Sequence, residues 1–229
     1  MKKLIYILPL FTASILVNCG ANESEADQTS KETAQEKSAP GETEVQNLYN
    51  LDPTTAVVKW TAFKLAEKVG VEGEFKSYSM TGYHENATSV SEMMTGTEIS
   101  LDVTSTKTGD EARDGKIINS FFGSMINTPS ITARLVSMDG ETQGKAQVEI
   151  TMNETSFTQE MEWIFREDLS TFILQGVVNI PDWNAQSALD ALTIVCEEKH
   201  KGTGDKAVTW PDVEVKANVK VIVAPAEGV

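Results

Sequence analysis

The sequence predicts a mainly β protein, built as an eight-stranded antiparallel barrel with two short helices. Three observations support this fold class. From residue 54 onward apolar and polar residues alternate with a period of two, turn-forming residues separate the alternating segments, and two segments show helical spacing instead. Closing eight strands into a barrel removes the unpaired edges of the sheet, and a two-layered sandwich is the competing arrangement.

Eight segments are expected to form strands, and four of them show the alternation most clearly. These four runs begin at Val58, Ile99, Ala146 and Val213. Each run predicts a strand with one dry face and one wet face, as is common in antiparallel sheets. In chain order, the expected strands cover residues 55–65, 70–80, 96–106, 130–138, 143–152, 156–165, 170–180 and 208–223.

Two segments interrupt the alternation with apolar residues at helical spacing. The first covers residues 110–122, where Asp110 is a plausible N-cap. The second covers residues 185–200, with Asn184 as the expected cap and Gly202 after its end. The apolar stripes consist of Ile117, Ile118, Phe121 and Phe122 in the first helix and of Ala188, Leu189, Leu192, Val195 and Cys196 in the second.

The N-terminal residues predict export and a lipid anchor. Residues 1–18 combine two lysines with an apolar run from Leu4 to Val17. At about 1.5 Å per residue this run is shorter than the roughly 30 Å hydrocarbon core of a bilayer, so a removable signal peptide is expected rather than a spanning helix. The run ends in a sequence that resembles a bacterial lipobox, which makes Cys19 the predicted site of lipid attachment and anchors the protein to the membrane.

Residues 19–46 are expected to form the lipidated cysteine and a disordered acidic tether, and residues 47–229 the folded domain. The tether contains no aromatic residue and few aliphatic ones, so it cannot bury enough apolar surface to offset its ordering entropy. A lipid on Cys19 places the protein in the cell envelope, at the outer membrane. The acidic residues of the tether suit either a surface-export signal or a plain spacer. The sequence is therefore compatible with either the periplasmic or the surface face of that membrane.

The charge excludes one large class of partners. The chain of 229 residues has a net charge of −15, and residues 47–229 hold 27 acidic and 15 basic side chains. Nucleic acid is therefore not an expected partner, because binding phosphate requires clustered lysine and arginine. Electrostatic docking on an anionic membrane surface is disfavoured for the same reason.

Several stretches of the expected domain carry a family resemblance. The strand 58–63 follows the run Tyr49-Asn50-Leu51-Asp52-Pro53, and a valine-x-glycine-x-phenylalanine strand stands at residues 71–75. The longest match is Thr108-Gly109-Asp110-Glu111-Ala112-Arg113-Asp114-Gly115, which leads to Phe121-Phe122 and to Pro129-Ser130-Ile131-Thr132. Residues 48–223 thus resemble the YceI-like family of bacterial lipocalin-like, polyisoprenoid-binding proteins. The resemblance implies a lipocalin-like barrel whose apolar tunnel holds a long isoprenoid or a similar amphiphile.

The alternation supplies apolar residues that would line such a tunnel. None of them can act as an acid, a base or a metal ligand, although alternation alone does not separate a hollow barrel from a filled one. Two rim candidates are Arg113, which would contact a ligand head group or stabilise the first helix, and Trp183, which would lie at the mouth or anchor the packing. The expected lining residues are Val58, Trp60, Phe75, Ile99, Leu101, Val103, Ile131, Met161, Trp163, Phe165, Phe172, Leu174 and Val219.

The favoured hypothesis is a non-enzymatic carrier lipoprotein that sequesters an isoprenoid, a quinone or a similar long apolar ligand. The alternative is a surface interaction module whose solid barrel holds no ligand. A third hypothesis is an enzyme built around Cys196 and His200, which stand one helical turn apart, but no third ligand or orienting group has a recognisable spacing. We therefore expect no catalytic residue, no metal and no cofactor other than the bound ligand, and the sequence leaves a homodimer open.

Overall fold

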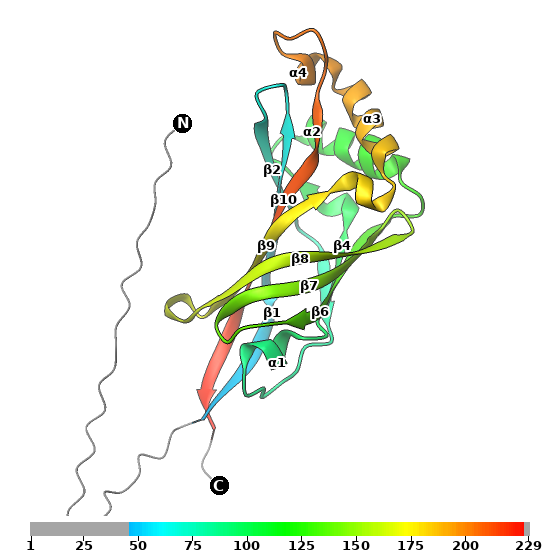
Figure 1. The fold of residues 1–229 in the computed structure, drawn as a ribbon. Coiled ribbons are helices and arrows are strands. Elements are labelled where there is room, and N and C mark those ends of the chain that lie inside the picture. Colours follow the sequence, from blue (N-terminus) through cyan, green and yellow to red (C-terminus); the bar gives the residue numbers. More distant parts are fainter. Residues whose placement is uncertain (1–45, 227–229) are drawn as a thin grey trace, which may run out of the picture. The chain divides into compact units, whose positions relative to one another are not determined.

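A computed structural model describes residues 46–226. Its dominant feature is one curled antiparallel sheet of ten strands that forms a half-barrel (Figure 1). The mainly β fold class is therefore confirmed. The expected signal peptide, Cys19 and all of the expected tether except Gln46 lie outside the described residues.

The strands follow one another in the sheet in the order β3-β4-β6-β7-β8-β9-β10-β1-β2-β5. Every pairing between neighbours is antiparallel, as the one-sided alternation of the sequence predicts. The strands are β1 (Asn47–Lys64), β2 (Val69–Phe75), β3 (Tyr78–Thr81), β4 (Glu98–Asp102), β5 (Thr106–Lys107), β6 (Ser130–Met138), β7 (Gln143–Met152), β8 (Thr155–Arg166), β9 (Thr171–Asn179) and β10 (Thr209–Pro225).

The count of ten instead of eight arises because two expected strands are bent in the middle. The segment expected at 70–80 divides into β2 and β3, and the segment at 96–106 divides into β4 and β5. The two bends face each other. The hydroxyl of Ser105 accepts hydrogen bonds from the backbone N–H groups of Lys76 (3.2 Å) and Ser77 (3.0 Å). Backbone hydrogen bonds also join the bends, so the two ends of the sheet order are tied together at this corner.

The helical segments gather mainly at one end of the sheet. Figure 1 shows α2, α3 and α4 beside the turn that joins β1 to β2, whereas α1 lies at the other end. The helix expected at 110–122 begins at its predicted cap, Asp110, whose carboxylate accepts from the N–H of Arg113 (3.1 Å), and continues through a π-helical turn, η2. The bounds are α1 (Val90–Met94), α2 (Glu111–Lys116), η2 (Ile117–Phe121), α3 (Gln186–Val195) and α4 (Glu197–Lys201).

The helix expected at 185–200 differs from the prediction in two respects. It is broken at Cys196, which separates α3 from α4. The expected cap, Asn184, instead ends a preceding 3₁₀ turn (Ile180–Trp183) in the left-handed conformation, with φ at 55°. Within the described residues, no helix has both the length and the apolar character needed to span a bilayer.

Candidate functional site

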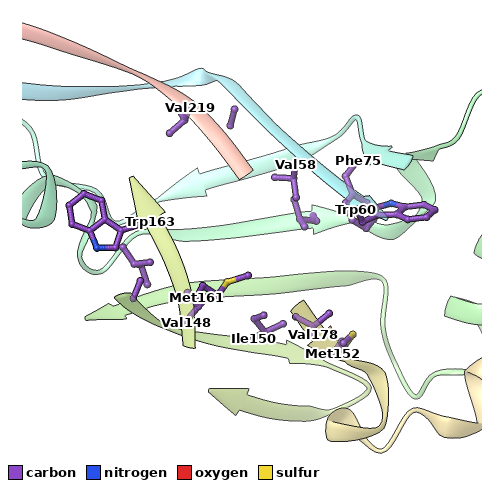
Figure 2. Packing of buried hydrophobic residues seen from close by; sticks show 14 of the residues in the cluster. Val58, Trp60, Phe75, Val148, Ile150, Met152, Met161, Trp163, Val178 and Val219 are labelled. Atoms are coloured by element: carbon purple, nitrogen blue, oxygen red, sulfur yellow. The ribbon is translucent and has the colours of Figure 1, made fainter. Parts of the chain in front are cut away.

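An apolar cavity of about 200 Å³ lies between the concave face of the sheet and the helical segments at one end. Strands β1, β2, β4 and β6 to β10 contribute to its wall, together with η2 and α3. Figure 2 shows Val58, Trp60 and Phe75 on one side of this interior and Ile150 and Met152 on the other. The cavity is therefore suited to an apolar group, because its wall offers a ligand few hydrogen-bond donors or acceptors.

Most of the expected lining residues surround this cavity. It is lined by Val58, Trp60, Phe75, Ile99, Leu101, Ile131, Met161 and Leu174 from the predicted set. Phe172 and Val219 line a smaller void of about 60 Å³. The two spaces are adjacent because they share wall residues, among them Val58, Ile99 and Leu174.

Three expected lining residues are buried away from both spaces. The indole of Trp163 stacks on Phe172, with ring centroids 5.9 Å apart, and its N–H donates to the backbone oxygen of Asp139 (2.9 Å). Phe165 meets Tyr49 edge to face at 6.0 Å. Val103 is buried in a 3₁₀ turn at the corner between β4 and β5. These side chains fill the interior of the fold.

The cavity wall also contains residues outside the predicted set. Alternation in β7 and β10 and the two helical stripes were visible signals for many of them, because those patterns predict faces turned to the core. The additional apolar wall residues are Ala62, Ile117, Phe121, Phe122, Ala133, Val148, Ile150, Met152, Val178, Ile180, Leu189, Leu192, Trp210, Val213, Val215 and Ala217.

A second pocket of about 290 Å³ adjoins the cavity, and we call it the mouth pocket. It shares Trp60, Ala62, Ile117, Leu192 and Thr209 with the cavity wall. Its other lining residues are Phe63, Lys64, Val71, Asp110, Ala112, Arg113, Lys116, Cys196, Lys199 and His200. The apolar cavity thus lies next to a pocket bordered by charged side chains.

Arg113, one of the two rim candidates, borders the mouth pocket. Its Nε donates to the hydroxyl of Thr108 (2.9 Å). The neighbouring Asp114 is buried and accepts from the N–H (2.8 Å) and the hydroxyl (2.6 Å) of Thr108. Burial raises the pKa of Asp114, but these hydrogen bonds and the charges of Lys107 and Arg113 outweigh it, so that the pKa lies below its usual value.

Trp183, the other rim candidate, lies in the core. Its side chain is fully buried, its indole N–H donates to the backbone oxygen of Ile150 (2.8 Å), and its ring meets Phe157 edge to face at 5.5 Å. Its own backbone oxygen accepts from the amide of Asn153 (2.8 Å). The structure therefore supports the packing role of Trp183.

Cys196 and His200 both border the mouth pocket. Cys196 is a free, buried thiol at the junction of α3 and α4. The Nδ1 atom of His200 lies 2.7 Å from the hydroxyl of Thr209. Burial lowers the pKa of His200, and the positive charges of Lys64 and Lys116 lower it further. Among residues 46–226, no three His, Cys, Asp or Glu side chains are grouped to hold a metal ion.

Comparison with known proteins places the fold. A search of the curated proteins gives no match. Among solved structures, BcnA of Burkholderia cenocepacia aligns with a TM-score of 0.53 at 16% identity, over 76% of this chain and 99% of its own. A polyisoprenoid binding domain from Saccharophagus degradans aligns with a TM-score of 0.55 at 14% identity, over 79% of this chain and 99% of its own. The model of the YceI-like domain matches residues 49–221, and the chain therefore belongs to the YceI-like family.

Proposed function

We propose that the domain is a non-enzymatic carrier that sequesters an apolar chain-like ligand, such as an isoprenoid or a quinone, in its cavity. The apolar cavity of about 200 Å³ inside the half-barrel is the observation that carries this proposal. Each methylene group moved from water into such a space contributes about 0.8 kcal/mol. A solid scaffold that serves only as an interaction module would have no such cavity, and the cavity therefore favours the carrier.

The volume of the cavity limits the ligand. Small-molecule pockets commonly measure roughly 300–1,000 Å³, so the cavity as it stands holds a slender chain or one part of a long one. Met152 and Met161 line the cavity, and Met80 and Met94 line the adjacent void. Methionine side chains are unbranched and adapt to irregular spaces, which gives a longer chain a way to connect the two.

The chemistry of the wall supports binding without catalysis. The polar side chains on it are Lys59, Thr209 and Lys216, with the indole N–H of Trp210 donating to the backbone oxygen of Leu65 (2.8 Å). Where the structure describes it, this wall carries no carboxylate, imidazole or thiol to act as a base. The hydroxyl of Thr209 lies 2.7 Å from Nδ1 of His200, but that imidazole borders the mouth pocket instead. The polyisoprenoid binding domain with the same fold supports the assignment by analogy.

The lipobox-like sequence extends the proposal to a carrier anchored at the outer membrane through Cys19. A lipid anchor would keep the domain beside the bilayer, where apolar molecules dissolve. Sequestration there would serve transport or storage of the ligand, or protection against stress.

The direct test is to purify the full-length protein from its native membrane, extract it with organic solvent and identify the lipids by mass spectrometry. We expect about one equivalent of an apolar chain-like molecule per chain. Absence of a stoichiometric lipid would overturn the carrier function.

Filling the cavity provides a second test. Ala133 lies on β6 and borders both the cavity and the smaller void, so Ala133→Phe should lower the amount of co-purified lipid at least about tenfold, a loss of about 1.4 kcal/mol. Val136→Phe is the matched control, because Val136 is exposed on the same strand and should keep the lipid. Equal lipid content in both variants would contradict a ligand in this cavity.

A further inference from the structure

The mouth pocket concentrates positive charge in a domain that is acidic as a whole. Lys64, Arg113, Lys116 and Lys199 border it, and Asp110 is the one carboxylate among its lining residues. Residues 47–229 nevertheless hold 27 acidic and only 15 basic side chains. The local excess of cations is therefore opposite in sign to the charge of the domain around it.

These cations are not neutralised by ion pairs. Within residues 46–226, none of the four has a carboxylate oxygen within 4.0 Å of its charged nitrogens. The nearby acid Asp114 is instead paired with Lys107 (3.7 Å) and held by Thr108. A cluster of like charges without partners is unfavourable, and an anion placed among them relieves the repulsion.

Three elements bring the four cations together. Lys64 ends β1, Arg113 and Lys116 lie on α2, and Lys199 lies on α4. Lys116 also has a structural task, because its Nζ donates to the backbone oxygen of Val195 (2.8 Å) and ties α2 to the end of α3. In the part of the chain that the structure describes, the side chains of Lys64, Arg113 and Lys199 have no hydrogen bond or ion pair to a carboxylate, and that of Arg113 donates only to Thr108. Their charges can therefore be used by a ligand.

His200 borders the same pocket as these charges. Burial is the main cause of the lowered pKa of its imidazole, and Lys64 and Lys116 lower the pKa further because a nearby positive charge disfavours the protonated ring. Lys64, Arg113, Lys116 and Lys199 therefore give the mouth pocket a positive potential beside the apolar cavity.

The groove on the outer face of the sheet shows the opposite pattern. This groove shares Trp60 and Met161 with the wall of the cavity. Its charged border consists of Glu72, Glu160, Glu162 and Glu214 with Lys59 and Lys216. Acidic side chains predominate there, so of these two pockets beside the cavity only the mouth pocket suits an anion.

We propose that the ligand is an anionic amphiphile, whose carboxylate or phosphate head is bound by Arg113, Lys64 and Lys199 while its apolar chain occupies the cavity. Trp60, Ala62, Ile117 and Leu192 line both the cavity and the mouth pocket, so the cations lie beside the apolar cavity. Guanidinium and ammonium groups form short, charge-assisted hydrogen bonds to carboxylates and phosphates. A quinone or an isoprenoid alcohol would leave these charges unused. The inference rests on the proposed carrier function.

The test compares three probes that share one chain and differ in the head group: decanoate, decyl phosphate and decan-1-ol. Calorimetric titration into the full-length protein, stripped of bound lipid, should give at least one anion binding about tenfold more tightly than the alcohol, a difference of about 1.4 kcal/mol. Raising the salt concentration should weaken binding of that anion and leave decan-1-ol unchanged. The relative affinities of decanoate and decyl phosphate identify which head the pocket prefers.

Variants locate the head group. The double variant Lys64→Gln/Lys199→Gln, and the same variant with Arg113→Gln added, should lose the preference for the anion while binding decan-1-ol as before. Lys145→Gln is the matched control, because Lys145 pairs with Glu160 and Glu162 and none of these three residues lines the mouth pocket. Arg113→Lys should keep part of the preference, and melting temperatures confirm that each variant is folded.

The outcomes separate the two proposals. Equal affinity for all three probes, or a preference that survives in the triple variant, would overturn the anionic head while the carrier function stands. Failure of all three probes to bind, together with no lipid in the native extract, would overturn the carrier function itself.

Discussion

Gly73 and Trp60 show how one residue without a side chain shapes the site. They are directly paired across β1 and β2, and the indole of Trp60 lies where a Cβ on residue 73 would stand. The indole N–H also donates to the buried hydroxyl of Thr106 (3.3 Å). Because Trp60 borders the cavity and the mouth pocket, this close approach fixes the wall between them.

Gly73→Ala should therefore displace the indole and destabilise the domain by about 1–3 kcal/mol. Urea unfolding monitored by tryptophan fluorescence measures the change. Gly115→Ala is the control, since a Cβ there meets nothing within 4 Å and the position lies in α2, where alanine is preferred to glycine. A Gly73→Ala variant as stable as the wild type would show that Trp60 moves freely.

Asp114 couples the stability of the domain to acidic pH. Its pKa is lowered in the folded state, so it contributes stability above its unfolded pKa of roughly 4, and this contribution is lost as the pH falls through the lower folded value. At neutral pH, Asp114→Asn should cost about 1–3 kcal/mol, because the hydrogen bonds from Thr108 lose their charged acceptor.

The check is the urea midpoint of the wild type and Asp114→Asn between pH 7 and about pH 2. The two proteins should differ at neutral pH and converge as the wild-type carboxylate is protonated. A gap that is constant across this range would contradict the role of the charge.

Among the elements, the bent strand pairs form the corner of the sheet. Ser105 accepts from the N–H groups of Lys76 and Ser77 at the bend between β2 and β3, while Asp102 caps the 3₁₀ turn opposite by accepting from the N–H of Thr104 (2.9 Å). These side chains satisfy backbone groups that a regular ladder would otherwise pair.

Ser105→Ala removes this acceptor and should cost about 1–2 kcal/mol. Amide hydrogen exchange of Lys76 and Ser77 is the most direct readout and should speed up, while exchange in the centre of β7 should not change unless the whole domain unfolds. Unaltered protection at the two amides would contradict the role of the Ser105 hydroxyl in the corner.

Elements defined by interactions between residues close in sequence are predictable, whereas those that depend on residues far apart in sequence are not. Alternation is local, so the strands on either side of each bend were foreseen. The bends depend on contacts such as Ser105 with Lys76, which are 29 positions apart, and no local pattern encodes them. Helix α1 was not foreseen because it has only five residues, although Ser89 and Glu92 form its cap.

The same distinction explains which residues of the cavity wall the sequence predicts. Alternation predicts which face of a strand turns inward, and Met161, Trp163 and Phe165 on β8 are all buried. It does not predict the position along the strand at which the interior is hollow. Met161 borders the cavity, whereas Trp163 and Phe165 lie further along β8, where other aromatic rings fill the space.

For the whole molecule, the predicted attachment to the membrane depends on Cys19. The described residues contain no helix that could span a bilayer, and Cys19 is the predicted anchor. Cys19→Ser should move the protein from the membrane fraction to the aqueous fraction, and labelling with a radioactive fatty acid should be lost at the same time. Membrane association that persists in this variant would contradict anchoring by Cys19.

The long pairing of β1 with β10 also determines how long a tether must be for the mouth pocket to reach the membrane. The two strands join Asn47 to Pro225 at one end, and Lys64 to Thr209 beside the mouth pocket at the other, so the point where the tether enters and the mouth lie at opposite ends of β1. The 18 residues of β1 span at most about 60 Å at roughly 3.3 Å each. A chain of the 27 residues at 20–46 reaches about 90 Å when extended. If Cys19 anchors the protein, the domain can therefore rotate and bring the mouth pocket to the same bilayer while Cys19 stays attached to it.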